Sequence, residues 1–180
     1  DIELIRWQGN TESGDPLISL CDGYLKKFCQ QGGGLAYTNG GAIDSANVIA
    51  TFTNVLNGLP ASVRNRKADL RFRVSSNVAS AYELAAASGN TLTYVTLPLG
   101  LTFLGIKVVV CEGMPDNTIV ASLKDDLIYA FDAEGDSKAL KAVNLTDSVA
   151  EPYIRTRANV KAGFYFSNPD QIAVWADCFN

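Results

Sequence analysis

The 180-residue chain contains no histidine. Histidine is the usual general base and the commonest transition-metal ligand, so its absence excludes Ser-His-Asp and Cys-His triads, histidine-ligated zinc sites and two-His-one-carboxylate iron sites. The four cysteines form no CxxC pair, which excludes a zinc-ribbon or redox motif. No run approaches the roughly 18 apolar residues that a membrane-spanning helix needs. Much of the usual chemistry of enzymes is therefore missing from this sequence.

A strong charge of one sign is also lacking, because 15 Lys and Arg stand against 19 Asp and Glu, for a formal net charge of -4. Such a chain has no overall field that attracts phosphates, which argues against a dedicated nucleic-acid-binding protein. With 47% hydrophobic and 19% charged residues, the composition is that of a folded globular domain. The length fits about one domain.

The sequence begins at Asp1, and its only methionine is Met114. It also lacks the charged-then-apolar opening of a secretory signal. We therefore expect a processed product or part of a longer chain.

Three segments combine helical spacing of apolar residues with capping residues: 15–29, 44–58 and 76–89. If the first is one helix, Cys21 and Cys29 lie about 12 Å apart along its axis, too far for a disulfide. We expect the cysteines to be reduced and mostly buried as small apolar side chains.

Strand patterns occupy much of the remaining chain. Residues 70–74 alternate apolar and basic side chains and precede the third helix, which gives a βα unit. Residues 101–111 are predicted to form one continuous central strand, and residues 118–123 a second buried strand. Asp125 and Asp126 are expected to cap a short turn that carries Leu127, Ile128 and Phe131.

The C-terminal third predicts antiparallel strands. Residues 160–166 and 172–176 alternate on either side of a turn at 168–170, which predicts a hairpin, and 140–145 and 153–157 are further strand candidates. The predicted fold class is α+β: a mixed α/β domain whose central sheet is flanked by helices, with antiparallel C-terminal strands.

No motif predicts a cofactor or an enzyme. The run Gly32-Gly33-Gly34 matches neither phosphate-binding glycine pattern, and no GxSxG elbow or SxxK dyad occurs. An acidic cluster could hold a metal, but its glycine falls at the fourth position rather than the sixth of an EF-hand loop. Its members are Asp125, Asp126, Asp132, Glu134 and Asp136. A solvated turn is the simpler interpretation.

Basic residues concentrate at Arg64, Arg66, Lys67, Arg71 and Arg73, with no aromatic stacking platform beyond Phe72. This pattern favours a solvated face or a subunit-contact surface over nucleic-acid binding.

Several runs, taken in order, carry a resemblance to a known family: Trp7-Gln-Gly-Asn10 and residues 20–25, 68–77, 104–110, 114–117, 118–123, 127–131, 155–166 and 172–175. In this order they resemble the major capsid proteins of tailed bacteriophages, which have the HK97-like fold. The resemblance implies that 1–14 is the junction from an upstream spine region, 15–135 an axial-type α/β domain and 136–180 the strands that end the peripheral domain. It also implies a long helix and an extended hairpin upstream of Asp1.

The function implied by this resemblance is structural. A phage or prophage capsid subunit assembles with itself, as hexamers and pentamers, into an icosahedral shell that encloses DNA, in the virion and earlier in the host cytoplasm. No enzymatic activity, cofactor, metal, specific nucleic-acid binding or membrane partner is expected. The charged residues expected at contacts between subunits are Arg64, Arg66, Lys67, Asp132, Glu134 and Asp136.

Three other interpretations remain open. An encapsulin-like compartment shell would use the same fold. A small-molecule or carbohydrate-binding α/β domain would use a pocket near the glycine loops, and a metal-dependent hydrolase would use the acidic cluster.

Overall fold

The computed structural model describes residues 2–31, 34–88, 100–131, 141–144, 154–157 and 162–177. The chain divides into two compact units, Asp1–Ile128 with Phe164–Asn180, and Tyr129–Gly163. The helices are α1 (Ile2–Gln8), η1 (Ile18–Leu20), α2 (Tyr24–Gln30), α3 (Val48–Gly58), α4 (Ala61–Arg64), α5 (Ser76–Ser88) and η3 (Pro169–Gln171). The strands are β1 (Ala36–Asn39), β2 (Leu70–Val74), β3 (Thr102–Phe103), β4 (Ile106–Val110), β5 (Ile119–Leu123), β6 (Leu127–Phe131), β7 (Lys141–Asn144), β8 (Ile154–Arg157), β9 (Ala162–Phe166) and β10 (Ala173–Ala176).

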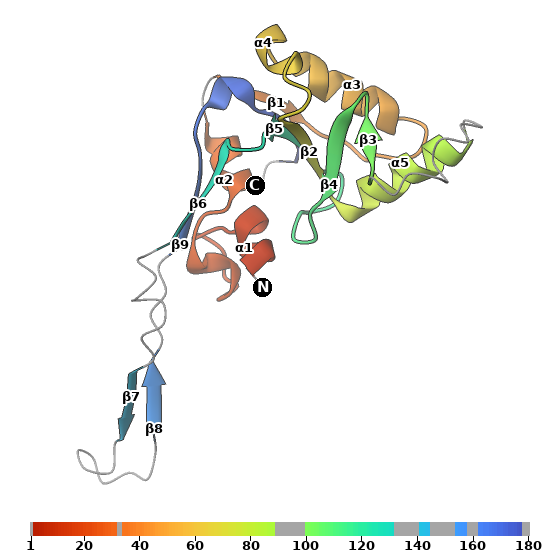
Figure 1. The fold of residues 1–180 in the computed structure, drawn as a ribbon. Coiled ribbons are helices and arrows are strands. Elements are labelled where there is room, and N and C mark those ends of the chain that lie inside the picture. Colours follow the sequence, from red (N-terminus) through yellow and green to blue (C-terminus); the bar gives the residue numbers. More distant parts are fainter. Residues whose placement is uncertain are drawn as a thin grey trace. The chain divides into compact units, whose positions relative to one another are not determined.

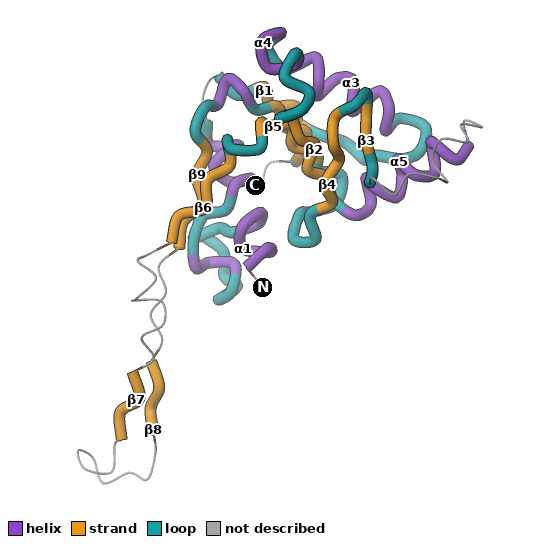
Figure 2. Tube along the Cα trace, viewed as in Figure 1, coloured by secondary structure: helices purple, strands orange, loops and turns teal. Residues whose placement is uncertain are grey.

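A six-stranded mixed sheet forms the centre of the first unit, in the order β1-β10-β5-β2-β4-β3 (Figures 1 and 2). Two pairs in it are parallel, β1 with β10 and β2 with β4. The other three pairs are antiparallel. Because β2 leads through α5 into the parallel strand β4, this part of the sheet is the βα layer that the sequence predicts.

Alternate side chains of the sheet pack against α3 and α5. In β2 the fully buried residues are Leu70, Phe72 and Val74. They share one core with Phe52 of α3 and Tyr82 of α5. The helices predicted over 44–58 and 76–89 and the strand over 70–74 are therefore confirmed.

The opposite face of the sheet meets α1 and α2 in a second core. Val120 and Val174 point to this side, where they pack with Trp7 of α1 and with Tyr24 and Phe28 of α2. The ring of Tyr24 lies 5.4 Å from that of Trp7. Residue alternation in β5 explains why it is buried along its whole length, since each of its faces meets a different core.

The strands outside this sheet form two pairs. β6 and β9 make a two-stranded sheet. β7 and β8 pair antiparallel with Lys141 opposite Arg157, which confirms the strands predicted near 140–145 and 153–157. Assignment of these segments to axial and peripheral domains, with boundaries at 14 and 135, stays a prediction.

The single helix predicted over 15–29 is wrong. The backbone is extended at Cys21 and at Gly23, so the segment forms η1 and then α2. A Cβ at Gly23 would lie 2.7 Å from the Ile5 carbonyl oxygen, so glycine permits α1 to pack closely against this turn. Cys21 is a free thiol, whereas Cys29 is disulfide-bonded, so the expectation of reduced cysteines fails for Cys29.

The continuous strand predicted over 101–111 is a hairpin instead. β3 and β4 pair antiparallel with Phe103 opposite Ile106, so only Leu104 and Gly105 form the turn. Both have positive φ, 50° and 82°, as a type I′ turn requires. The strand predicted over 118–123 is confirmed as β5.

Two further predictions near the C-terminus are wrong. The short turn expected to follow Asp125 and Asp126 is the strand β6. The hairpin expected from 160–166 and 172–176 does not form, because β9 pairs with β6 while β10 inserts between β1 and β5. Alternation identified the strands correctly but carried no information about their partners.

Candidate functional site

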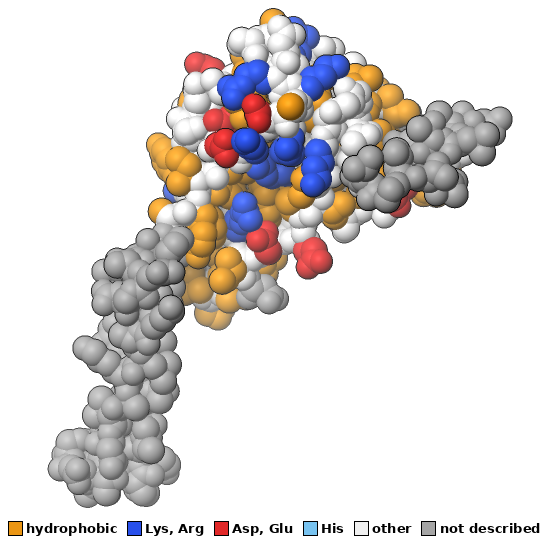
Figure 3. Space-filling view, in the orientation of Figure 1, with side chains coloured by type: hydrophobic (Ala, Val, Ile, Leu, Met, Phe, Trp, Pro, Cys, Tyr) orange, Lys and Arg blue, Asp and Glu red, His pale blue; other side chains and the backbone are white. Residues whose placement is uncertain are grey.

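Seven cations of the first unit form what we call the basic surface: Arg64, Arg66, Lys67, Arg71, Arg73, Lys107 and Lys124. Arg71 and Arg73 alternate in β2 with core residues, so they lie on the sheet face away from α3 and α5. Lys107 of β4 lies opposite Arg71 in the parallel register. Figure 3 shows Lys and Arg side chains gathered on the visible face of this unit. Strand alternation and register therefore bring together cations that are distant in sequence.

An ion-pair chain ties the turn before β2 to the turn after β5. Arg66 Nη2 lies 3.4 Å from Asp69 Oδ2, and Lys124 Nζ lies 3.2 Å from Asp69 Oδ1. The hydrogen bond and charge of Lys124, with a smaller contribution from Arg66, hold the pKa of Asp69 below its ordinary value. Asp69 is the one acid that forms ion pairs with these seven cations in the part of the chain that the structure describes.

Hydrogen bonds to neutral acceptors fix two of the arginines. Arg73 donates from Nη1 to Ser122 Oγ at 2.6 Å and from Nη2 to the Lys124 carbonyl at 3.4 Å. Arg71 Nη1 donates to the carbonyls of Ala68 and Leu70. Burial lowers the pKa of Arg73, although a guanidinium remains charged at neutral pH. These acceptors hold the side chains in place without neutralising them.

Lys67 reaches the tip of the β3–β4 hairpin. Its Nζ donates to the carbonyl oxygen of Leu104 at 3.2 Å. Leu104 is 60% exposed. It also has a positive φ, a backbone conformation that is unusual for leucine. The basic surface therefore includes the apolar side chain of Leu104, which lies on a turn that the Lys67 hydrogen bond holds in place.

Of the six charged residues predicted at subunit contacts, the structure describes three. Arg64, Arg66 and Lys67 all belong to the basic surface; Arg64 ends α4, and its Nη1 donates to Asn57 Oδ1 at 3.4 Å. The predicted acidic residues Asp132, Glu134 and Asp136 lie outside the described residues.

The two described residues of the acidic cluster, Asp125 and Asp126, differ in exposure. Asp125 is exposed, whereas Asp126 is buried and accepts a hydrogen bond from Ser167 Oγ at 2.7 Å. Within the described ranges, no group of three or more Cys, Asp or Glu residues is placed to hold a metal.

The sequence did not single out Lys107 and Lys124 as part of this surface. Lys107 alternates with the buried residues Ile106 and Val108, which is the available signal of an outward-facing position in β4. That β4 lies beside β2 depends on a pairing between distant segments, which alternation alone does not specify.

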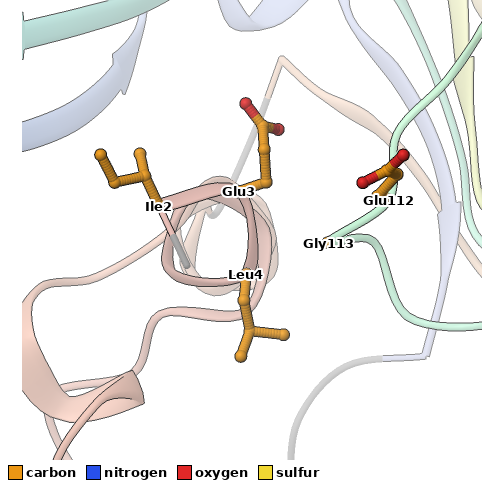
Figure 4. A pocket seen from close by; sticks show the side chains of 5 residues that line it. All are labelled: Ile2, Glu3, Leu4, Glu112 and Gly113. Carbon is orange, nitrogen blue, oxygen red and sulfur yellow. The ribbon is translucent and has the colours of Figure 1, made fainter.

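A hollow with a volume of about 680 Å³ lies where α1 meets the turn after β4. Figure 4 shows its lining residues, Ile2, Glu3, Leu4, Glu112 and Gly113. Its side chains are two aliphatic groups and two carboxyl groups, and it has no cationic, amide or hydroxyl side chain that could donate a hydrogen bond. This lining does not match the convergent donors expected of a phosphate or carbohydrate site.

No protein-family model matches the chain, and no curated protein matches it either. No helix in the ranges that the structure describes has the length and apolar character to cross a bilayer.

Solved structures do match. A chain of the satellite phage P4 procapsid, an assembly that includes the size determination (Sid) protein, is 8% identical with a TM-score of 0.65, over 98% of this chain and 62% of that one. A chain of the capsid of an empty GTA particle is 21% identical with a TM-score of 0.63, over 99% and 62%. A virus-like particle from Pyrococcus furiosus is 14% identical with a TM-score of 0.51, over 83% and 58%. The chain thus spans about three-fifths of the length of these proteins.

These likenesses show the fold. The chain has the HK97-like fold of major capsid proteins, built here as a mixed α/β structure with a six-stranded sheet between helices. The fold predicted from the order of sequence motifs is confirmed.

Proposed function

We propose that this chain is part of a major capsid subunit of a phage or phage-like particle and that its role is structural. The observation that carries the proposal is the agreement in fold over 98% of the chain with the P4 procapsid and over 99% with the GTA capsid. A shell subunit functions through contacts with other copies of itself, so its partner would be the same protein. It would need neither a general base nor a cofactor.

The charge distribution supports a shell around nucleic acid without specific recognition of it. A net charge of -4 gives no general attraction for packaged phosphates. In this proposal the protein self-associates as hexamers and pentamers, resides in the virion, and passes through the host cytoplasm during assembly. The sequence upstream of Asp1 would supply a long spine helix and an extended hairpin.

A second candidate is an encapsulin-like compartment shell. The likeness to the virus-like particle from Pyrococcus furiosus favours it, since the TM-score is 0.51 over 83% of the chain. The two candidates share their self-association and differ in what the shell contains.

The test is to produce the full-length protein that contains this chain in bacteria and to analyse it by sedimentation velocity and negative-stain electron microscopy. Closed shells of uniform diameter are expected. A protein that stays monomeric at high concentration would overturn both candidates. Nuclease-resistant DNA inside particles from the native source supports a capsid, and particles filled with protein support a compartment.

A further inference from the structure

We propose that the basic surface, together with Leu104, binds the acidic segment 125–136 of a second copy of this chain. This inference rests on the proposed function and names the partner surface for one of its subunit contacts. The argument starts from how charge is distributed along the sequence.

Charges of opposite sign are concentrated in two short segments. Residues 64–73 contain five bases and one acid, a net of +4. Residues 125–136 contain five acids and no base, a net of -5, although Asp126 is buried within its own copy and does not face a partner. Every copy of the chain carries both segments, so each copy offers one surface and one segment that complement those of another. Such a contact between different surfaces is heterologous and closes into rings when repeated with the right rotation.

Three cations of the basic surface are held in place by contacts within their own copy. Ser122 Oγ accepts from Arg73, carbonyls accept from Arg71, and the Leu104 carbonyl accepts from Lys67. Neutral acceptors position these groups while their positive charge stays available. Binding an acidic segment therefore costs less side-chain entropy than binding to freely rotating lysines and arginines would.

The basic surface and the described part of the segment both carry exposed apolar side chains. Leu104 is 60% exposed among the cations. In segment 125–136, Ile128 is 42% exposed and Tyr129 is 43% exposed. A small apolar centre inside a charged rim is the usual anatomy of a protein interface, and electrostatic complementarity adds specificity and register.

The test uses two charge-reversed variants of the full-length protein. The surface variant carries Lys67→Glu and Lys107→Glu, and the segment variant carries Asp132→Lys and Glu134→Lys. Each is produced alone, and the two are also produced together. Circular dichroism and thermal melting establish that each variant folds. If the surface variant does not fold, Arg66→Glu with Lys107→Glu replaces it, since both side chains are exposed.

Each variant alone is expected to lose at least tenfold in assembled particles, because two of its charged positions then meet charges of the same sign and the attraction between surface and segment falls. The mixture is expected to recover assembly in part. The two new glutamates of one variant then meet the two new lysines of the other, and the native surface of the second variant meets the native segment of the first. A contact within one copy predicts no such recovery.

The outcomes separate this inference from the proposed function. If the unaltered protein forms shells and either folded variant alone also assembles normally, the inference is overturned. The capsid proposal then still stands. Shells from the unaltered protein with no recovery in the mixture also overturn the inference. An unaltered protein that forms no shells overturns the capsid proposal itself.

Discussion

At the residue scale, Leu104 is the least expected side chain of the basic surface. The first position of a type I′ turn favours Asn, Asp or Gly, because a left-handed backbone costs other L-residues roughly 1–2 kcal/mol. Leu104 has φ 50° there and exposes 60% of its surface, so its side chain gains little from packing within its own subunit. Local strain retained at an exposed position is often associated with function.

Leu104→Asn should therefore raise stability and weaken assembly. The relieved backbone is expected to add about 1 kcal/mol to the free energy of unfolding. The Lys67 hydrogen bond is kept, because its acceptor is the backbone carbonyl. Urea denaturation measures the first effect and sedimentation of assembled particles the second. Gly105→Ala is the matched control, expected to destabilise at φ 82°. A Leu104→Asn protein that is less stable than the original would contradict this view of the turn.

A second prediction at this scale concerns pH. Lys124 and Arg66 lower the pKa of Asp69 in the folded protein, whereas its unfolded value is about 3.9. The ion pairs therefore stabilise the fold at pH values above the unfolded pKa, and this contribution disappears as the pH falls through the folded pKa. Asp69→Asn should be less stable than the original at pH 7, and the difference should shrink below about pH 3.9.

Denaturant titrations at pH 7 and at pH 3 check this prediction. Lys124→Met serves as the control, since it removes the first partner of Asp69 and should reduce the same pH-dependent difference. A difference between Asp69→Asn and the original that stays constant with pH would show that the carboxylate charge does not stabilise these turns.

At the element scale, α3 is anchored by one aromatic side chain. Phe52 is fully buried, and its ring centroid lies 5.0 Å from that of Phe72 in β2 and 5.1 Å from that of Phe103 in β3. Its ring also lies 5.2 Å from Tyr82 of α5. One side chain thus joins two helices to two strands of the sheet.

Phe52→Ala should cost about 3–5 kcal/mol of unfolding free energy, because it removes buried contacts and leaves a cavity. Ile49→Ala on the same helix is the control, because Ile49 is 50% exposed and should change stability by only about 0.5 kcal/mol. Chemical denaturation of both variants checks the contrast. Equal losses would mean that α3 is not held through Phe52.

The elements that the sequence predicted well are those with local signals. The helices α3 and α5 bury apolar residues at helical spacing, Asp44 accepts hydrogen bonds from the backbone of Ala46 and Asn47 just before α3, and β2 has clear alternation. The β3–β4 hairpin was missed because Leu104-Gly105 lacks the usual Asn-Gly signature of its turn. The position of β10 was missed because strand pairing depends on residues far apart in the chain.

The candidate site shows the same limit. Arg64, Arg66 and Lys67 were identified as a group from sequence proximity alone. Lys107 and Lys124 join them only through the register of β4 and β5 against β2. The face to which a strand residue points can be predicted from alternation, but its neighbours across the sheet require the fold.

At the scale of the whole molecule, contact between the basic surface and an acidic segment predicts sensitivity to salt. The Debye length falls from about 10 Å at 0.1 M salt to about 3 Å at 1 M, so exposed charge pairs weaken as the ionic strength rises. We expect the full-length protein to assemble more slowly and less completely at high NaCl, as followed by light scattering. The surface variant Lys67→Glu with Lys107→Glu should show a smaller salt dependence. Assembly of the original protein that is unaffected by salt would argue for an apolar interface.

The place of β10 in the sheet also sets the order in which the protein can form. Ala36 pairs with Ala173, so two neighbours in the sheet lie 137 positions apart in the sequence. During synthesis β1 has no strand partner in this sheet until β10 has left the ribosome, while β2 and β5 can already pair. Pairings this distant slow folding, because loop closure must come first. Chains interrupted before residue 173 would leave strand edges unpaired at β1 and β5. Such chains would aggregate or be degraded, so they would not be available as subunits for assembly.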